Sequence, residues 1–196
     1  MKATFFQRFV AYIIDIVILS IILSIVAFGV DMTKANELSD EMSNVMSSYT
    51  SGEITIDEYL SQSTELSYDY QKATTVVNII SLVLTIGYFT VFQYLNKGQT
   101  IGKKLMKIKV ASKKKEPSIK SMIIRTFIID GIISSGLSIG LLYVLSKSAY
   151  ITAYNVISFV FEAIIIVSAL MVLYRKDKKG IHDMLARTEV VSEKGE

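Results

Sequence analysis

Three acidic residues stand inside long apolar segments, where an ionised side chain is costly. They are Asp15, Asp130 and Glu162, one in each of three separate segments. A carboxylate far from water must hold a proton, pair with a cation or face a wet cavity. Competition between a proton and a metal ion for one such carboxylate is the chemistry of proton-coupled cation transport. The three acids are therefore the candidate ion or proton sites of this chain.

Few basic side chains are available to neutralise these acids. Arg125 is the only one within an apolar segment. It precedes Asp130 by five residues, which places it on another face of a helix, and its long side chain can reach the membrane surface. One arginine cannot neutralise three acids, so at least one acid should hold a proton or an exchangeable cation. The alternative is a satisfied polar network that only fixes helix packing. Both readings stay open for Asp15, and the network is favoured for Asp130.

The composition excludes several kinds of chemistry. Among 196 residues there is no cysteine and one histidine, so thiol catalysis, disulfides and Cys- or His-based metal sites are excluded. The segment 97–104 is similar to a phosphate-binding loop, but it is one residue short and has Lys104 where serine or threonine is needed. His182 beside Asp183 lacks a nucleophile motif, so a helix-terminal salt bridge or hydrogen bond is favoured. We therefore expect no enzyme, no cofactor and no metal centre.

Four apolar runs are long enough to cross a membrane. A helix needs ~20 residues to span a hydrocarbon core of about 30 Å. The first run follows Lys2 and Arg8, as a signal peptide would, but it is longer than a signal core of roughly 7 to 15 residues, and three more runs follow. The sequence thus predicts an all-α integral membrane protein with four transmembrane helices, forming one domain over residues 1–196. The predicted spans are 9–30, 74–95, 121–145 and 151–174.

Basic residues gather on one side of the predicted spans. The loop 96–120 and the tail 175–196 are rich in them, whereas the outer segment 31–72 carries nine acidic residues and two lysines. Because basic loops stay in the cytoplasm, both termini should be cytoplasmic. The net charge of +3 hides this split and favours contact with anionic lipid headgroups over nucleic-acid binding. The composition suits a bacterial cytoplasmic membrane. The lysines of the loop are Lys97, Lys103, Lys104, Lys107, Lys109, Lys113, Lys114, Lys115 and Lys120.

Short-range patterns predict structure between the spans. Apolar residues at helical spacing from Leu38 to Tyr49 indicate one outer helix, and Thr55 with Glu58 forms a capping box that opens a second. We expect an extracellular helical hairpin between the first two spans. Alternating apolar residues in the segment 106–110 predict a short cytoplasmic strand.

Helical spacing aligns each intramembrane acid with other polar residues. At ~1.5 Å of rise per residue from the cytoplasmic ends, Asp15 lies ~9 Å deep, Asp130 ~13 Å and Glu162 ~18 Å. The acids and their polar stripes should therefore converge inside the bundle. Four short spans make a narrow bundle, so a transporter would need to oligomerise to complete a pathway. The stripes are Arg8, Ala11, Tyr12 and Asp15 on the first span; Thr126, Asp130, Ser134 and Ser138 on the third; and Asn155, Ser158 and Glu162 on the fourth.

Three blocks of sequence form an ordered pattern around the predicted spans. The blocks are Arg8, Ala11 and Asp15 with the aliphatic run that follows, the segment 98–104, and the segment 180–191. In order and position they resemble the RDD family of bacterial membrane proteins over nearly the whole chain. The family is named for one arginine and two aspartates, which correspond here to Arg8, Asp15 and Asp183. Arg187, where the family often has glycine, and the long acidic outer segment depart from the pattern.

The resemblance implies a membrane role that is often proposed to be transport, and some members are described as monovalent cation/proton antiporters. We accordingly expect monovalent cation/proton antiport at intramembrane carboxylates, with the lipid bilayer, monovalent cations and protons as partners. A homo-oligomer or an unidentified protein partner is also expected. The alternative is a non-transporting membrane adaptor or accessory protein that binds a membrane or secreted partner through its outer hairpin or its lysine-rich loop.

The family-motif residues also suggest a connection between the first span and the tail. Arg8 and Asp183 both fall at the predicted cytoplasmic surface, so a bridge between them is expected. Asp15 lies two turns deeper on the same helix face as Arg8. A chain of contacts from Asp183 through Arg8 to Asp15 would carry a charge change inward from the cytosol.

Overall fold

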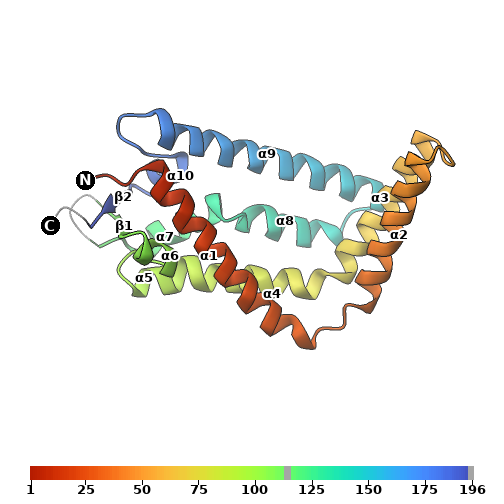
Figure 1. Ribbon diagram of the computed structural model, residues 1–196, viewed down its shortest axis with the longest axis horizontal. Coiled ribbons are helices and arrows are strands. Elements are labelled where there is room, and N and C mark those ends of the chain that lie inside the picture. Colours follow the sequence, from red (N-terminus) through yellow and green to blue (C-terminus); the bar gives the residue numbers. More distant parts are fainter. Residues whose placement is uncertain (113–115, 194–196) are drawn as a thin grey trace.

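The protein is a bundle of long helices with a helical hairpin at one end and a small sheet at the other (Figure 1). The computed structural model describes residues 1–112 and 116–193. Lys113, Lys114, Lys115 and Lys194, which belong to the basic segments used above to predict orientation, lie outside the described residues. In chain order the elements are α1 (Phe5–Val26), η1 (Ala27–Gly29), α2 (Thr33–Thr50), α3 (Ile56–Ala73), α4 (Thr75–Ile86), η2 (Gly87–Phe92), α5 (Gln93–Leu95), α6 (Ile101–Leu105), β1 (Ile108–Ala111), α7 (Ile119–Ile129), α8 (Ile132–Leu142), α9 (Lys147–Tyr174), α10 (Ile181–Leu185) and β2 (Glu189–Ser192).

Three helical stretches are long and apolar enough to cross a membrane, and a bent pair makes a fourth if it counts as one span. The stretches are Phe5–Gly29, Thr75–Leu95 and Lys147–Tyr174, and the pair is α7 with α8. Their outward surfaces are apolar, as Ile25 at 71% and Phe159 at 73% exposure illustrate. Apolar surface on this scale suits lipid surroundings. The prediction of a helical membrane protein is confirmed at this level.

The third predicted span, 121–145, is not one straight helix as the sequence suggested. It divides into α7 and α8, whose axes differ by 64°. Gly131 stands at the break with φ of +68°, in the left-handed region that favours glycine. The depth of ~13 Å assigned to Asp130 rested on a straight helix, so it no longer applies. The break instead places Asp130 between two helix ends.

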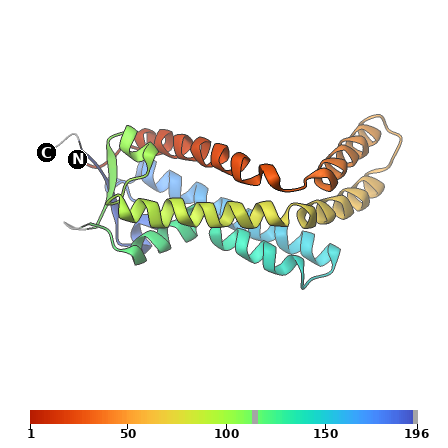
Figure 2. The same cartoon turned by 90° about the horizontal axis from the view of Figure 1, so that it is seen from below.

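The expected hairpin consists of α2 and α3, which pack against each other at the end of the bundle away from the termini (Figure 2). The predicted capping box is present, with the Thr55 N–H donating to Glu58 Oε2 at 2.8 Å and the Glu58 N–H donating to Thr55 Oγ1 at 3.3 Å. Lys147 at the start of α9 binds Glu65 and Asp69 of α3, at 2.7 and 3.3 Å. These ion pairs join the hairpin to the last long helix.

The predicted strand is present as β1, and its partner is a strand that the sequence did not predict. β2 pairs antiparallel with β1, with Val110 opposite Val190, and Lys2 forms an isolated bridge to Val191. Ile108 of β1 and Met122 of α7 are fully buried in one apolar cluster. The N-terminal residues, the middle loop and the tail are therefore held together at one end of the bundle.

Candidate functional site

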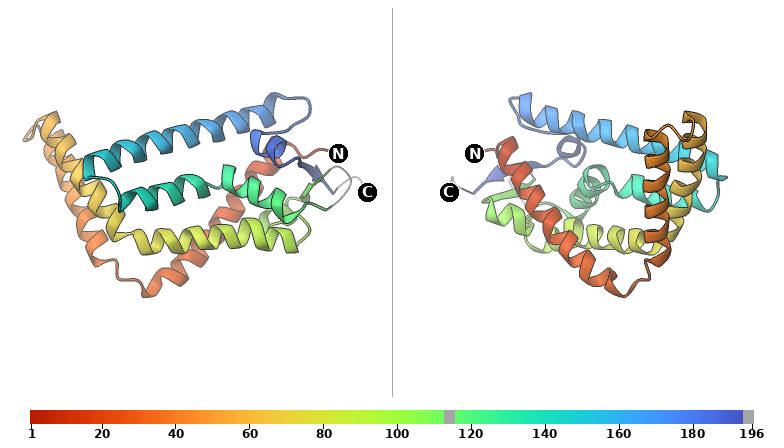
Figure 3. Two further views of the ribbon diagram at one scale, coloured as in Figure 1. Left: turned by 180° about the vertical axis from the view of Figure 1, so that it is seen from behind. Right: turned by 45° about the vertical axis from the view of Figure 1, so that its right-hand side comes forward.

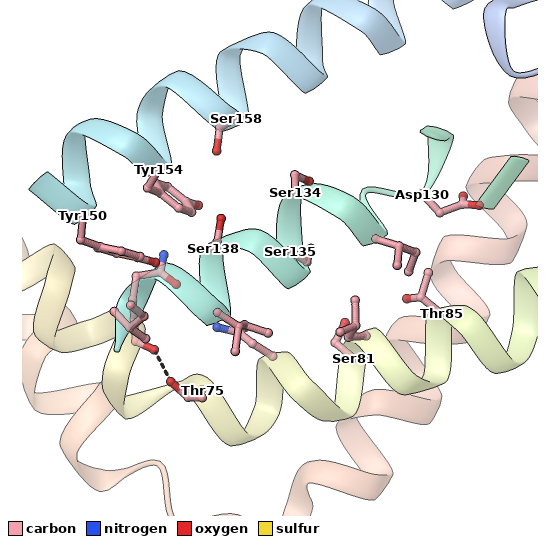
Figure 4. Close-up of a pocket in the computed structure, with 16 residues that line it drawn as sticks. Thr75, Ser81, Thr85, Asp130, Ser134, Ser135, Ser138, Tyr150, Tyr154 and Ser158 are labelled. Carbon is pink, nitrogen blue, oxygen red and sulfur yellow. Dashed lines mark hydrogen bonds between the residues drawn. The ribbon is translucent and has the colours of Figure 1, made fainter. Parts of the chain in front are cut away.

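A polar cavity of about 290 Å³ lies between α4, α8 and α9 (Figure 4). This volume accommodates roughly ten water molecules at about 30 Å³ each. Its lining is mostly hydroxyl and amide groups, with one carboxylate, which is unusual for space between apolar helices. The polar lining residues include Thr75, Asn78, Ser81 and Thr85 from α4, Asp130 at the α7–α8 break, Ser134, Ser135 and Ser138 from α8, and Tyr150, Tyr154 and Ser158 from α9.

Helical spacing explains how these side chains reach one space. On α4, polar residues recur every three or four positions and so share a face, while the remaining face is apolar. Ser134 and Ser138 are four positions apart and share a face of α8, as predicted for the polar stripe of the third span. The α4 stripe was not identified from the sequence, although the spacing of Thr75, Asn78 and Thr85 carries the signal. The cavity depends on all three helices.

Asp130 lies at the end of this cavity away from Tyr150 (Figure 4). Its Oδ1 atom is buried and has no hydrogen-bond partner in the part of the chain that the structure describes. Asp130 also lines a second cavity of about 310 Å³, here called the charged-end cavity, together with Arg8, Lys103 and Arg125. One carboxylate is thus shared by two cavities, with one oxygen that has no donor from the protein.

Asp15, in contrast, is fully buried and fully hydrogen-bonded. Its Oδ1 accepts from the Tyr88 hydroxyl at 2.6 Å and from the Gly102 N–H at 2.7 Å, and its Oδ2 accepts from the Thr100 hydroxyl at 2.5 Å. These donors come from η2 and from the start of α6. Asp15 therefore holds the loop after the second span against α1. Of the two alternatives that the sequence left open for Asp15, the structure has the hydrogen-bonded polar network.

Gly102 makes this contact between α1 and α6 close enough to form. A Cβ at this position would stand 2.1 Å from the backbone oxygen of Ala11 and 2.8 Å from Asp15 Oδ1, so a larger residue does not fit. Thr100 caps α6, because its side chain accepts from the Lys103 N–H at 3.3 Å while donating to Asp15. The segment 98–104 is thus the binding partner of Asp15.

The second motif aspartate, Asp183, is buried between two arginines. Its Oδ2 accepts from Arg8 Nη1 at 2.7 Å, which is the expected bridge between the first span and the tail. Its Oδ1 accepts from Arg125 Nη1, which also donates to the Thr188 hydroxyl at 2.8 Å. Burial raises the pKa of Asp183, but the charges of Arg125 and Arg8 outweigh burial and hold this pKa below its ordinary value. Asp183 is a structural anion at physiological pH.

Arg125 is buried and binds Asp183 of the tail. One expectation about the arginines is wrong. The relay from Asp183 through Arg8 to Asp15 is not formed, because Arg8 donates to Asp183 and to the Lys178 carbonyl oxygen. The two arginines pair with the tail aspartate, and within the described residues no hydrogen bond or ion pair joins either of them to Asp15 or Asp130.

Two other titratable residues face the charged-end cavity. Burial, followed by the charge of Arg125, lowers the pKa of His182 to about 3, so this histidine is neutral. It forms the expected hydrogen bond, with 2.8 Å between its Nδ1 and Ser168 Oγ. Ser168 is buried and accepts from the Ile181 N–H, so it joins α10 to α9. Burial lowers the pKa of Lys103 to about 8, partly opposed by Asp15.

Glu162 does not converge with the other acids, contrary to the sequence prediction. It is exposed on the outer side of α9 and lines neither cavity. Tyr150 and Ser168, which face the bundle, lie about 120° away from it around the helix axis at 100° per residue. The predicted stripe of Asn155, Ser158 and Glu162 therefore divides, and only Ser158 faces the polar cavity.

Comparison with known proteins identifies one family. The model of the RDD family matches residues 2–187, nearly the whole chain, and confirms the resemblance noted from the sequence. No curated protein and no solved structure matches the chain. The matched region includes Arg8, Asp15 and Asp183 as well as Asp130.

Proposed function

The chain belongs to the RDD family, and from that premise we propose that it exchanges monovalent cations for protons across a membrane, with Asp130 as the exchange site. The observation that carries the proposal is the buried, unpartnered Oδ1 of Asp130 beside a polar cavity. An ionised carboxylate in this position is costly, so a proton or a cation must occupy it. Each excludes the other, and that competition couples their movements.

The lining of the polar cavity supports a monovalent cation in particular. Hydroxyl, amide and carboxylate oxygens are the ligands that hard cations such as Na⁺, K⁺ and Li⁺ prefer. The described lining contains one carboxylate, whose single negative charge balances one monovalent cation. Asp15 and Asp183 do not compete for this role, because both are already satisfied by protein donors.

The broken span supports the same assignment. In many transporters discontinuous helices lie near the middle of the bilayer, where freed backbone groups help to bind ions. Asp130 and Gly131 occupy such a break between α7 and α8. Counting this pair as one span gives four spans. In our proposal both termini lie in the cytoplasm, the α2–α3 hairpin lies outside, and the protein spans a bacterial cytoplasmic membrane.

A transport assay tests the proposal. The purified protein is reconstituted into liposomes that contain a pH-sensitive dye, and Na⁺, K⁺ or Li⁺ is added outside. We expect cation-dependent proton movement that Asp130→Asn abolishes. Glu162→Gln, which changes an intramembrane carboxylate outside both cavities, is the matched control and should retain the flux. Equal flux from wild type and Asp130→Asn, with both proteins folded, would exclude Asp130 as the site.

One observation favours the alternative, a membrane adaptor without transport activity. Met46, Tyr49, Ile56 and Leu60 expose apolar side chains toward the tip of the hairpin, at 37 to 54% exposure. Exposed apolar residues outside the spans are a feature of protein-binding surfaces. An adaptor predicts no cation-dependent flux from folded wild-type protein, together with loss of a co-purifying partner in Met46→Ser and Leu60→Ser.

A further inference from the structure

The outer side of α9 is uncovered over most of the length of the helix. In Figure 1 and in the left view of Figure 3 the other long helices lie to one side of α9, and the α2–α3 hairpin meets it only at its start. Its side chains are strongly exposed, with Phe159 at 73%, Ile166 at 59% and Leu173 at 49%. In a membrane this surface faces lipid or another protein. Polar groups on such a surface are costly in lipid.

Two polar residues on this face lack partners. Asn155 and Glu162 are both exposed, and neither side chain has a hydrogen bond or an ion pair within residues 1–112 and 116–193. At about 1.5 Å per residue, Glu162 lies about 22 Å from Lys147 and about 18 Å from Tyr174, near the middle of the span. An amide or a carboxyl group left unpaired in hydrocarbon is costly. A partner with matching polar groups at the same depths removes that cost.

The spacing of the exposed residues indicates that the partner is a helix that packs along α9. The polar residues Ser148, Asn155 and Glu162 recur every seven positions, and the set Thr152, Phe159, Ile166 and Leu173 does the same with an offset of three or four. Two interleaved series with a period of seven are the pattern of a two-helix seam, in which each side chain packs against the facing helix.

We propose that this face, here called the α9 seam, joins two copies of the chain into a parallel dimer. Copies of one membrane protein insert with the same orientation, so a twofold axis normal to the membrane runs two α9 helices parallel. Each residue near that axis then faces its equivalent in the second copy. An asparagine amide both donates and accepts hydrogen bonds, and so does a carboxylic acid that holds its proton. Asn155 and Glu162 are thereby satisfied by their own counterparts.

A second copy fits this seam better than an unrelated membrane protein. An unrelated partner would need one group that hydrogen-bonds an amide and a second group, two helical turns away, that hydrogen-bonds a carboxyl group. In a symmetric dimer the second copy provides both groups, because its own Asn155 and Glu162 lie at the same depths. The polar cavity lies on the side of α9 that faces α4 and α8, and Asp130 lies beyond it, so dimerisation leaves both accessible.

Cross-linking of single-cysteine variants tests the seam, since the natural chain contains no cysteine. Phe159→Cys and Ile166→Cys lie on the seam. Val160→Cys and Val167→Cys are exposed controls about 100° farther around the same helix. In liposomes a short bis-maleimide should give dimers from the first pair at yields at least fivefold above those of the second. Equal yields from the two pairs would overturn the proposal.

A second measurement tests whether hydrogen bonds of Asn155 and Glu162 stabilise the dimer, beyond the contact between apolar side chains. The monomer–dimer equilibrium in liposomes is followed by energy transfer between labelled copies over a range of protein-to-lipid ratios. The double variant Asn155→Leu with Glu162→Leu should raise the dissociation constant at least tenfold, whereas Glu162→Gln should change it less than threefold. Monomeric wild-type protein at every ratio, or an unchanged constant in the double leucine variant, would contradict the dimer seam.

Discussion

Replacement of Gly102 by alanine should separate α6 from α1 and destabilise the protein. The new Cβ would lie 2.1 Å from the Ala11 oxygen and 2.8 Å from Asp15 Oδ1, so the two helices must move apart. That movement removes the Gly102 N–H hydrogen bond to the buried Asp15 carboxylate, which contributes about 1.5–3 kcal/mol. Overpacking adds about 1–3 kcal/mol. The expected loss in the free energy of unfolding is roughly 3–6 kcal/mol.

Thermal unfolding of the purified protein in detergent measures this loss. For a chain of this size each kcal/mol corresponds to about 2–4 °C, so the midpoint should fall by roughly 6–24 °C. Gly29→Ala is the matched control, because nothing lies within 4 Å of its added Cβ. A Gly102→Ala protein as stable as the Gly29→Ala protein would refute the role of Asp15 as the fastening between α1 and the loop after the second span.

Further predictions concern the charged end of the bundle. Asp183→Asn leaves the buried Arg125 and the partly buried Arg8 without their anion and should cost about 3–5 kcal/mol of stability, measured by thermal unfolding, whereas Asp177→Asn, at a partly exposed position, should cost little. Because the pKa of Asp183 is lowered in the folded state, its stabilisation is present above about pH 4 and lost below it. The wild-type unfolding temperature should therefore fall below pH 4, and less so in Asp183→Asn. Lys103 loses its charge above about pH 8, so cation exchange at Asp130 should rise through that pH in wild type but not in Lys103→Met.

Periodicity and composition are sufficient to predict the helices, the hairpin and its capping box. These features depend on residues close together in sequence, as Thr55 and Glu58 illustrate. The sequence also predicts the Arg8–Asp183 bridge, since both residues fall at the same predicted surface. The β2 partner of β1 could not be predicted, because pairing between segments about 80 residues apart depends on the whole fold.

The roles of the acids depend on which direction each helix faces, and the sequence does not specify this. Asp15 is satisfied by donors that follow it by more than 70 residues, so its donors are not visible in the local pattern. Glu162 has a suitable depth but lies on the outer face of α9. The expectation for Asp130 assumed a straight helix, and the break at Gly131 changed its surroundings. The depth of an acid within a predicted span therefore does not distinguish a residue that joins two segments, such as Asp15, from a candidate ion site, such as Asp130.

The most direct test of exchange at Asp130 measures the protons that are released when a cation binds. Purified protein in weakly buffered detergent solution with a pH indicator is titrated with Na⁺, K⁺ and Li⁺ at a pH where Asp130 holds its proton. Competition for one carboxylate predicts release of about one proton per chain in wild type and in Glu162→Gln, and none in Asp130→Asn. Release from Asp130→Asn equal to that of wild type, or cation binding to wild type without proton release, would contradict the account.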